Sequence, residues 1–242
     1  MKTRTVQHQI HELAKTEGLS FLTNKAPQFA EFVHQFAQQY NYDKGIKMFK
    51  KRGEDTVYSE LDQLHRRICF MPISVKDMTE IEKKRAQIML MLLSEKSSRE
   101  VKGQGVYNGK NTRDWVSGED KASPTATNEG IFVTGVVDAK EERDMMSNNI
   151  PNAFIQAKVP AKEEGKPHEK IIMKITRRLV DVLVLIAPEI YAKHVVYKNG
   201  KKVLYVKVLR ALYGMLISAM LWYNKFRSDL ENIGFEFNPY NP

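Results

Sequence analysis

The fold class is decided by residues 195–206, which read V-V-Y-K-N-G-K-K-V-L-Y-V. Two runs rich in β-branched and aromatic residues flank the dipeptide Asn199-Gly200. Because Asn and Gly both tolerate a positive φ, this dipeptide favours the type I′ turn of a tight β-hairpin. The stretch therefore predicts two antiparallel strands joined by a two-residue turn.

Helix and strand patterns lie on both sides of this hairpin. Upstream, we expect a strand at 169–175 and a helix at 177–187, which Pro188 limits. Downstream, the pattern predicts a helix from about 214 to 232 that ends before Gly234. The hairpin therefore has helical neighbours on both sides in the sequence.

A second hairpin is predicted earlier in the chain. Extended runs at 87–95 and 100–107 are separated by the polar break 96–99. Further elements are expected as helices at 29–36, 54–67 and 124–141, and as a strand at 144–148. We expect Pro72 to end the second of these helices and Thr125 to cap the third. Hairpins mixed irregularly with helices favour an α+β fold over a doubly wound sheet.

Apolar surroundings predict which aromatic side chains are buried. We expect four aromatic rings in the core, because their neighbours in the sequence are largely apolar: Phe132, Phe154, Tyr205 and Trp222. Base stacking is the alternative role for such rings.

The charge balance favours an anionic partner. Thirty-eight Lys and Arg oppose 29 Asp and Glu, which gives a net charge of +9. Such an excess favours polyanions, because each neutralised phosphate releases a condensed counterion. Five cations form one basic cluster: Lys44, Lys47, Lys50, Lys51 and Arg52. These side chains either contact nucleic-acid phosphates or form a solvated basic face.

The rest of the composition predicts an intracellular protein, without deciding between cytoplasm and nucleus. Cys69 is the only cysteine, so no disulfide partner is expected. The longest apolar stretch, 211–223, is shorter than the roughly 20 residues of a membrane span, so no membrane partner is expected.

Several short motifs follow one another between residues 53 and 242. They read E-L-D-Q-L-H at 60–65, K-G-Q-G-V-Y-N-G at 102–109, S-P-T at 123–125, D-A-K-E-E-R-D at 138–144, N-I-P-N-A-F at 149–154, A-L-Y-G at 211–214 and N-P-Y-N-P at 238–242. In this order they resemble the reverse transcriptase, an RNA-directed DNA polymerase, of Ty1/copia-type retrotransposons.

The resemblance implies a domain organisation and a set of site residues. Residues 1–44 would be a helical or partly disordered lead-in, 45–140 a fingers-like region and 141–242 a partial palm. By resemblance, the nucleotide-binding positions are Gln104, Asn152, Ala153, Phe154, Tyr213 and Gly214. Phe154 would exclude a ribose 2′-OH, and Tyr213 and Gly214 would lie beside the incoming base. The implied partner is an RNA or DNA template–primer.

This chain departs from the family pattern at its catalytic positions. Asn149 stands where the family has its first metal-binding aspartate, and Gln104 stands where it has an arginine. In the intact family three carboxylates hold two magnesium ions, but this sequence contains no adjacent Asp-Asp pair and ends before that hairpin is expected. Asp144 cannot replace the missing carboxylate, because it lies five residues before Asn149. In an extended strand that places it about 16 Å away and on the opposite face. We therefore expect no magnesium or other cofactor in this chain.

Three functional interpretations remain. The favoured one is a truncated, catalytically inactive copy of a transposable-element polyprotein. The alternative is a non-catalytic nucleic-acid-binding remnant or domesticated module, and an active polymerase is the third. If the strand at 144–148 lacks its partner hairpin, it becomes an exposed edge, and we expect a marginally stable chain.

Overall fold

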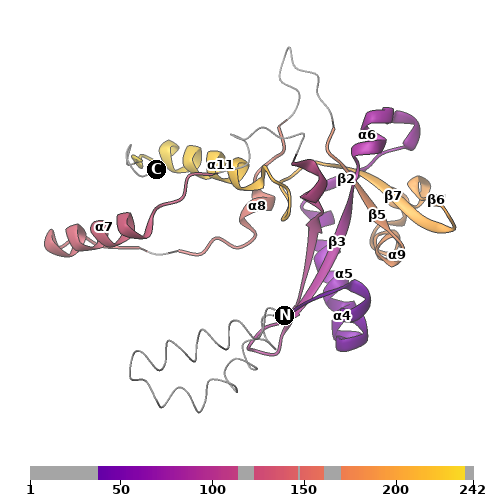
Figure 1. The fold of residues 1–242 in the computed structure, drawn as a ribbon, viewed down its shortest axis with the longest axis horizontal. Coiled ribbons are helices and arrows are strands. Elements are labelled where there is room, and N and C mark those ends of the chain that lie inside the picture. The colour runs from indigo at the N-terminus through magenta and orange to yellow at the C-terminus, as the bar shows by residue number, and fades with distance from the viewer. Residues whose placement is uncertain (1–37, 114–122, 147, 161–169, 238–242) are drawn as a thin grey trace. The chain divides into compact units, whose positions relative to one another are not determined.

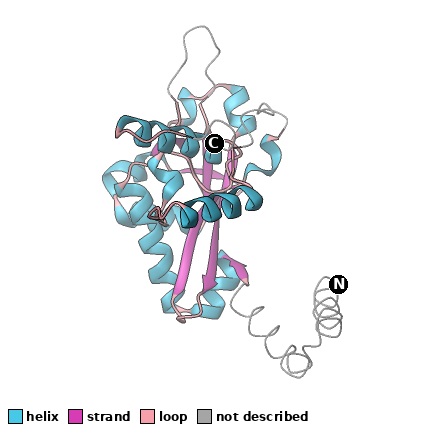
Figure 2. Ribbon diagram, turned by 90° about the vertical axis from the view of Figure 1, so that its left-hand side faces the viewer, coloured by secondary structure: helices cyan, strands magenta, loops and turns pink. Residues whose placement is uncertain are grey.

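A computed structural model describes residues 38–113, 123–146, 148–160 and 170–237. The chain divides into two compact units, Met1–Val57 with Met91–Gln104 and Tyr58–Leu90 with Gly105–Pro242. The described chain is built from both helices and strands (Figure 2), and each unit contains both. The predicted α+β class is therefore confirmed. The division runs through the region 45–140, and the fingers and palm boundaries stay a prediction.

The first compact unit is built around a hairpin shared with the second. It contains β1 (Gln39–Asn41), α4 (Tyr42–Phe49), the start of α5 (Lys51–Arg66), the end of β3 (Gln87–Glu95) and the start of β4 (Val101–Tyr107). Strand β1 pairs antiparallel with β3, and β4 also pairs with β3. The Asn41 side chain caps α4 by accepting from the backbone N–H of Lys44. Lys50, with φ 51°, separates α4 from α5.

Small residues let these helices approach the hairpin closely. A Cβ at Gly45 would lie 2.9 Å from the Cβ of Leu93, and one at Gly53 would lie 3.3 Å from Cδ2 of the same leucine. Leu93 is fully buried, and the rings of Tyr40 and Phe49 meet edge to face at 5.7 Å. The core of this unit therefore centres on Leu93.

The second compact unit contains the rest of the sheet. Its strands are β2 (Phe70–Pro72), the start of β3, the end of β4, β5 (Ile172–Thr176), β6 (Val196–Lys198) and β7 (Lys201–Val208). Strands β3 and β5 pair in parallel, whereas β5, β2 and β6 all pair antiparallel with β7. Strand β7 is therefore the centre of this part of the sheet.

The second unit also contains helices and short 3₁₀ turns. They are η1 (Val75–Asp77), α6 (Glu80–Arg85), η2 (Gly109–Thr112), α7 (Asn128–Lys140), α8 (Ala153–Gln156), α9 (Arg178–Ile186), α10 (Pro188–Tyr191), η4 (Ala192–His194) and α11 (Ser218–Asn232). Helix α9 packs against β5 and β7 (Figure 1). An apolar cluster forms from Met78, Ala86, Ile172, Val203 and Tyr205.

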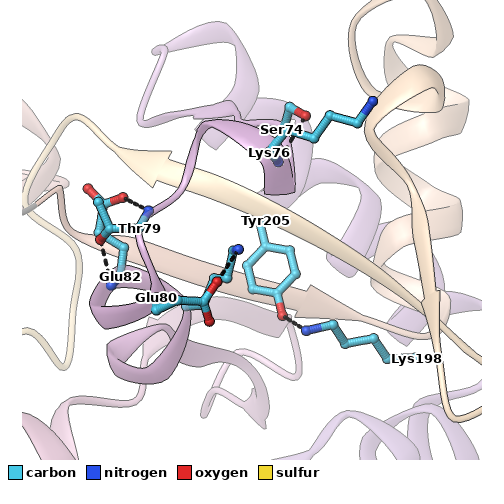
Figure 3. Close-up of polar contacts among 8 residues, drawn as sticks. Ser74, Lys76, Thr79, Glu80, Glu82, Lys198 and Tyr205 are labelled. Carbon is cyan, nitrogen blue, oxygen red and sulfur yellow. Dashed lines mark hydrogen bonds and ion pairs between the residues drawn. The ribbon is translucent and has the colours of Figure 1, made fainter.

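Polar contacts stabilise the start of α6 and the hydroxyl end of Tyr205, beside this cluster (Figure 3). Thr79 and Glu82 form a reciprocal capping box at the start of α6. The Tyr205 hydroxyl accepts from Nζ of Lys198 at 2.7 Å. Buried Tyr205 therefore keeps its polar end satisfied while its ring fills the core.

Both predicted hairpins are confirmed. Asn199 and Gly200 have φ values of 50° and 70°, as a type I′ turn requires. The earlier hairpin is formed by β3 and β4, close to the predicted runs 87–95 and 100–107. The predicted helices at 54–67 and 177–187 correspond to α5 and α9.

Several local predictions were wrong. Helix α5 ends at Arg66, and Pro72 lies in β2 instead of ending the helix. The N-cap of α7 is Thr127, not Thr125, because the Thr127 hydroxyl reaches the backbone N–H of Gly130 at 3.0 Å. The last helix begins at Ser218 instead of about 214. The predicted helix at 29–36 lies outside the described residues.

The predicted edge strand before Asn149 is also absent from the described part of 144–148. Residues 144–146 and 148 have no regular structure, and they pair with no described strand. Without a partner for its backbone groups an extended segment is not a strand. The expected core position of Phe132 is wrong as well, because its side chain is 74% exposed, whereas Tyr205 is buried as predicted. Phe154 and Trp222 are half-buried.

Candidate functional site

Two motifs that are far apart in the sequence lie side by side in the second unit. The backbone N–H of Ala211 donates to the carbonyl of Ala157 at 2.9 Å, and that of Val159 donates to the carbonyl of Leu209 at 2.9 Å. An antiparallel bridge joins Lys158 and Arg210 between these two bonds. The segment after N-I-P-N-A-F is therefore held against the segment that leads into A-L-Y-G.

The short helix α8 presents the first motif. Asn152 adopts a left-handed conformation, with φ 53° and ψ 37°, and starts the helix at Ala153. Ile155 is buried, whereas Phe154 is half-buried. At the other end, Nη1 of Arg210 donates to the carbonyls of Ile155 and Gln156, both at 3.3 Å. Positive charge at these carbonyls stabilises the C-terminal end of the helix.

The aromatic rings of the two motifs touch. The centroids of Phe154 and Tyr213 are 4.9 Å apart, and the ring planes are tilted by 51°. This spacing is within the range of attractive aromatic pairs. The rings therefore join α8 to the turn that precedes α11.

Gly214 lets a third motif approach this turn. Its φ is 84°, and a Cβ on it would lie 2.2 Å from the carbonyl oxygen of Tyr107. The backbone N–H of Tyr107 donates to the carbonyl of Tyr213 at 2.8 Å. A Cβ at Gly109 would in turn lie 2.2 Å from the oxygen of Gly214. Both positions thus need glycine for close backbone contact.

The structure brings together five of the six predicted nucleotide-binding positions. Asn152, Ala153 and Phe154 lie at the start of α8, and Tyr213 and Gly214 lie in the contacting turn. Gln104 is half-buried in β4 and belongs to the first compact unit. Asn149 is exposed, in an irregular segment shortly before α8.

The donor set around Asn149 does not fit two magnesium ions. Asn149 offers one neutral amide oxygen, whereas magnesium prefers carboxylates. Among the described residues, no group of three His, Cys, Asp or Glu side chains is arranged to hold a metal. Asn149 therefore brings no negative charge to a metal ion.

A pocket of about 220 Å³ adjoins the turn that contains Gly214. Its lining is Glu82, Arg85, Tyr107, Thr112, Lys170, Ile171, Ile172, Met215, Leu216 and Ile217. The side chain of Glu82 is buried, and its Oε1 lies 3.9 Å from Nζ of Lys170. Tyr107 is also buried, and its burial raises the pKa of its hydroxyl to about 12. The sequence did not single out Arg85 or Lys170, because they line one pocket only when α6 and the segment that leads into β5 come together.

The basic cluster lies on α4, at Lys50 between the two helices, and at the start of α5. All five side chains are exposed. Two of them are already engaged: Nζ of Lys51 lies 2.9 Å from Asp55, and Nη2 of Arg52 lies 2.9 Å from Glu95. The hydrogen bond to Asp55 and its negative charge raise the pKa of Lys51. The cluster is therefore accessible to solvent.

Two further sequence expectations concern membranes and disulfides. No helix in the described ranges is long and apolar enough to cross a membrane. Cys69 is a free, buried thiol. Burial is also the main cause that raises its pKa to about 11.

Comparisons with known proteins identified no relative of this chain. No protein-family model matches the sequence, and no curated protein or solved structure matches it.

Proposed function

We propose that this chain is a Ty1/copia-type reverse-transcriptase scaffold that no longer adds nucleotides. The observation that carries the proposal is the contact between Phe154 and Tyr213, at 4.9 Å. Two motifs that resemble parts of one nucleotide-binding site in that family are distant in this sequence but adjacent in space. Chance similarity of short motifs gives no reason for this proximity.

The chemistry of the site supports the loss of activity. Nucleotide addition in this family uses two metal ions held by carboxylates, and Asn149 supplies an uncharged amide instead. What remains around α8 is a surface for the sugar and base of a nucleotide, formed by Phe154, Tyr213 and the backbone at Ala153.

Primer extension tests this proposal directly. The full chain is incubated with a poly(rA) template, an oligo(dT) primer and dTTP, with magnesium in one series and manganese in another. We expect incorporation equal to the enzyme-free blank. Incorporation above the blank that is abolished in both Asn149→Ala and Phe154→Ala would overturn the proposal.

A second candidate function is binding of nucleic acid without catalysis. The observation that favours it is the exposed basic cluster, together with the net charge of +9. Lysines on a surface bind the phosphate backbone with little regard to sequence. Such a role implies an RNA or DNA partner inside the cell, and affinity measured against salt concentration tests it.

A further inference from the structure

Helix α7 exposes apolar side chains that no described part of the chain covers. None of the described residues of α7 is buried. The exposed fractions are 54% for Ile131, 74% for Phe132, 64% for Val133, 69% for Val136 and 39% for Val137. Several large apolar side chains side by side on a surface indicate an interaction site.

Exposed apolar side chains occur around this helix, with Ile131 on one side and four others together on the opposite side. Residues spaced by three and four lie on the same side of a helix. The face that results is here named the α7 strip, and it consists of Glu129, Phe132, Val133, Val136, Val137 and Lys140. Apolar residues fill its middle, a negative charge stands at one end and a positive charge at the other. Asp138 lies on the opposite face, where Arg143 approaches it to 3.8 Å.

We propose that the α7 strip binds the α7 strip of a second copy of this chain, with the two helices antiparallel. The strip is complementary to itself in this direction. Glu129 then faces Lys140 of the second copy, Phe132 faces Val137, and Val133 faces Val136. A parallel arrangement would instead place Glu129 against Glu129 and Lys140 against Lys140, which is unfavourable. Antiparallel pairing also satisfies the two-fold symmetry of a closed dimer.

The charged ends are available for this contact. Glu129 and Lys140 are both exposed, and neither forms an ion pair with another described residue. The 13 residues of α7 make a helix about 20 Å long. A contact of this length buries less than the roughly 800 Å² per partner of a standard interface, so the dimer is weak and depends on concentration.

Sedimentation velocity of the full chain, up to about 100 µM, tests the proposal, since weak dimers populate only at such concentrations. We expect a reversible monomer–dimer equilibrium. Phe132→Ser raises the dissociation constant at least about tenfold, because a large apolar side chain leaves the interface in each copy. Leu185→Ser is the matched control, since Leu185 is 72% exposed on α9 and should leave the constant unchanged.

Charge exchange tests the direction of pairing. Glu129→Lys places two like charges together at each end of an antiparallel dimer, and so does Lys140→Glu. Each variant alone is therefore expected to dimerise more weakly than the natural chain. An equimolar mixture of the two restores dimerisation, because the lysine introduced in one variant then faces the glutamate introduced in the other.

Three results would overturn the proposal. The first is a monomer at every concentration. The second is an equal change of the dissociation constant in Phe132→Ser and Leu185→Ser. The third is a mixture of the two charge variants that dimerises no better than either variant alone. Far-UV circular dichroism of each variant shows whether its fold is retained. The substituted side chains are all exposed, so the fold should persist.

Discussion

At the scale of single residues, Gly214 holds the candidate site together. Its positive φ suits glycine, and its missing side chain leaves room for the carbonyl of Tyr107. Gly200 also has a positive φ, of 70°, but no heavy atom lies within 4 Å of the place where its Cβ would be. Comparing the two glycines therefore distinguishes the cost of a left-handed backbone, which applies to both, from the cost of close packing, which applies only to Gly214.

We expect Gly214→Ala to destabilise the chain much more than Gly200→Ala. Both substitutions cost about 1–2 kcal/mol for the left-handed backbone. Gly214→Ala adds about 1–3 kcal/mol of steric overlap with Tyr107. Urea unfolding of the two variants measures the difference, and equal losses would contradict the close contact.

Cys69 gives a second prediction at this scale. Its pKa is raised from 9.0 to about 11 by burial, so the folded state keeps the thiol protonated when the unfolded chain already forms thiolate. This contribution to stability is complete below about pH 9 and is lost as the pH rises towards about 11.

The measurement compares urea midpoints at pH 8 and pH 10 for the natural chain and Cys69→Ala. We expect the natural chain to lose more stability between the two pH values than the variant does. Iodoacetamide at pH 8 should also label Cys69 slowly in water and rapidly in urea. Rapid labelling in water would show that the thiol is not buried.

At the scale of elements, the contact between α8 and the turn before α11 is the decisive feature. A double-mutant cycle with Phe154→Ala and Tyr213→Ala isolates it. We expect a coupling of about 0.5–1.5 kcal/mol in the free energy of unfolding, as for other aromatic pairs. The control pairs Phe154→Ala with Tyr197→Ala, because Tyr197 is 68% exposed on β6. Additive effects for Phe154 and Tyr213 would count against the site.

At the scale of the whole molecule, the charge of +9 predicts binding that is steeply salt-dependent. The first variant changes Lys44, Lys47, Lys50, Lys51 and Arg52 to Ala. Each of these that contacts a phosphate should reduce the slope of log affinity against log salt by about 0.9 for duplex DNA. We also expect affinity to change little between DNA sequences.

The matched control removes the same charge elsewhere. It changes five exposed lysines outside the cluster to Ala: Lys76, Lys84, Lys102, Lys193 and Lys201. If the cluster contacts phosphate, the first variant loses more affinity than this control. Equal losses would mean that only net charge matters, and no dependence on salt would exclude phosphate binding altogether.

The sequence by itself determined the elements whose signals are local. Asn199-Gly200 specified its hairpin, because positive φ at both turn residues is a property of those two residues. The motifs at 149–154 and 211–214 also identified, from the sequence, residues that the fold places in contact. That residue 149 is an asparagine, with an amide in place of a carboxylate group, can be read directly from the sequence.

Only the tertiary structure decided the features that depend on distant partners. The segment 144–148 was expected to be a strand, but strand formation requires a neighbour, and no described strand pairs with residues 144–146 or 148. Phe132 has apolar neighbours in the sequence, yet its burial depends on what packs against its side of α7, and the side chain is 74% exposed. Arg85 and Lys170 line one pocket because α6 and β5 come together. Local propensity cannot encode these outcomes, since each is a contact between segments that are far apart in the sequence.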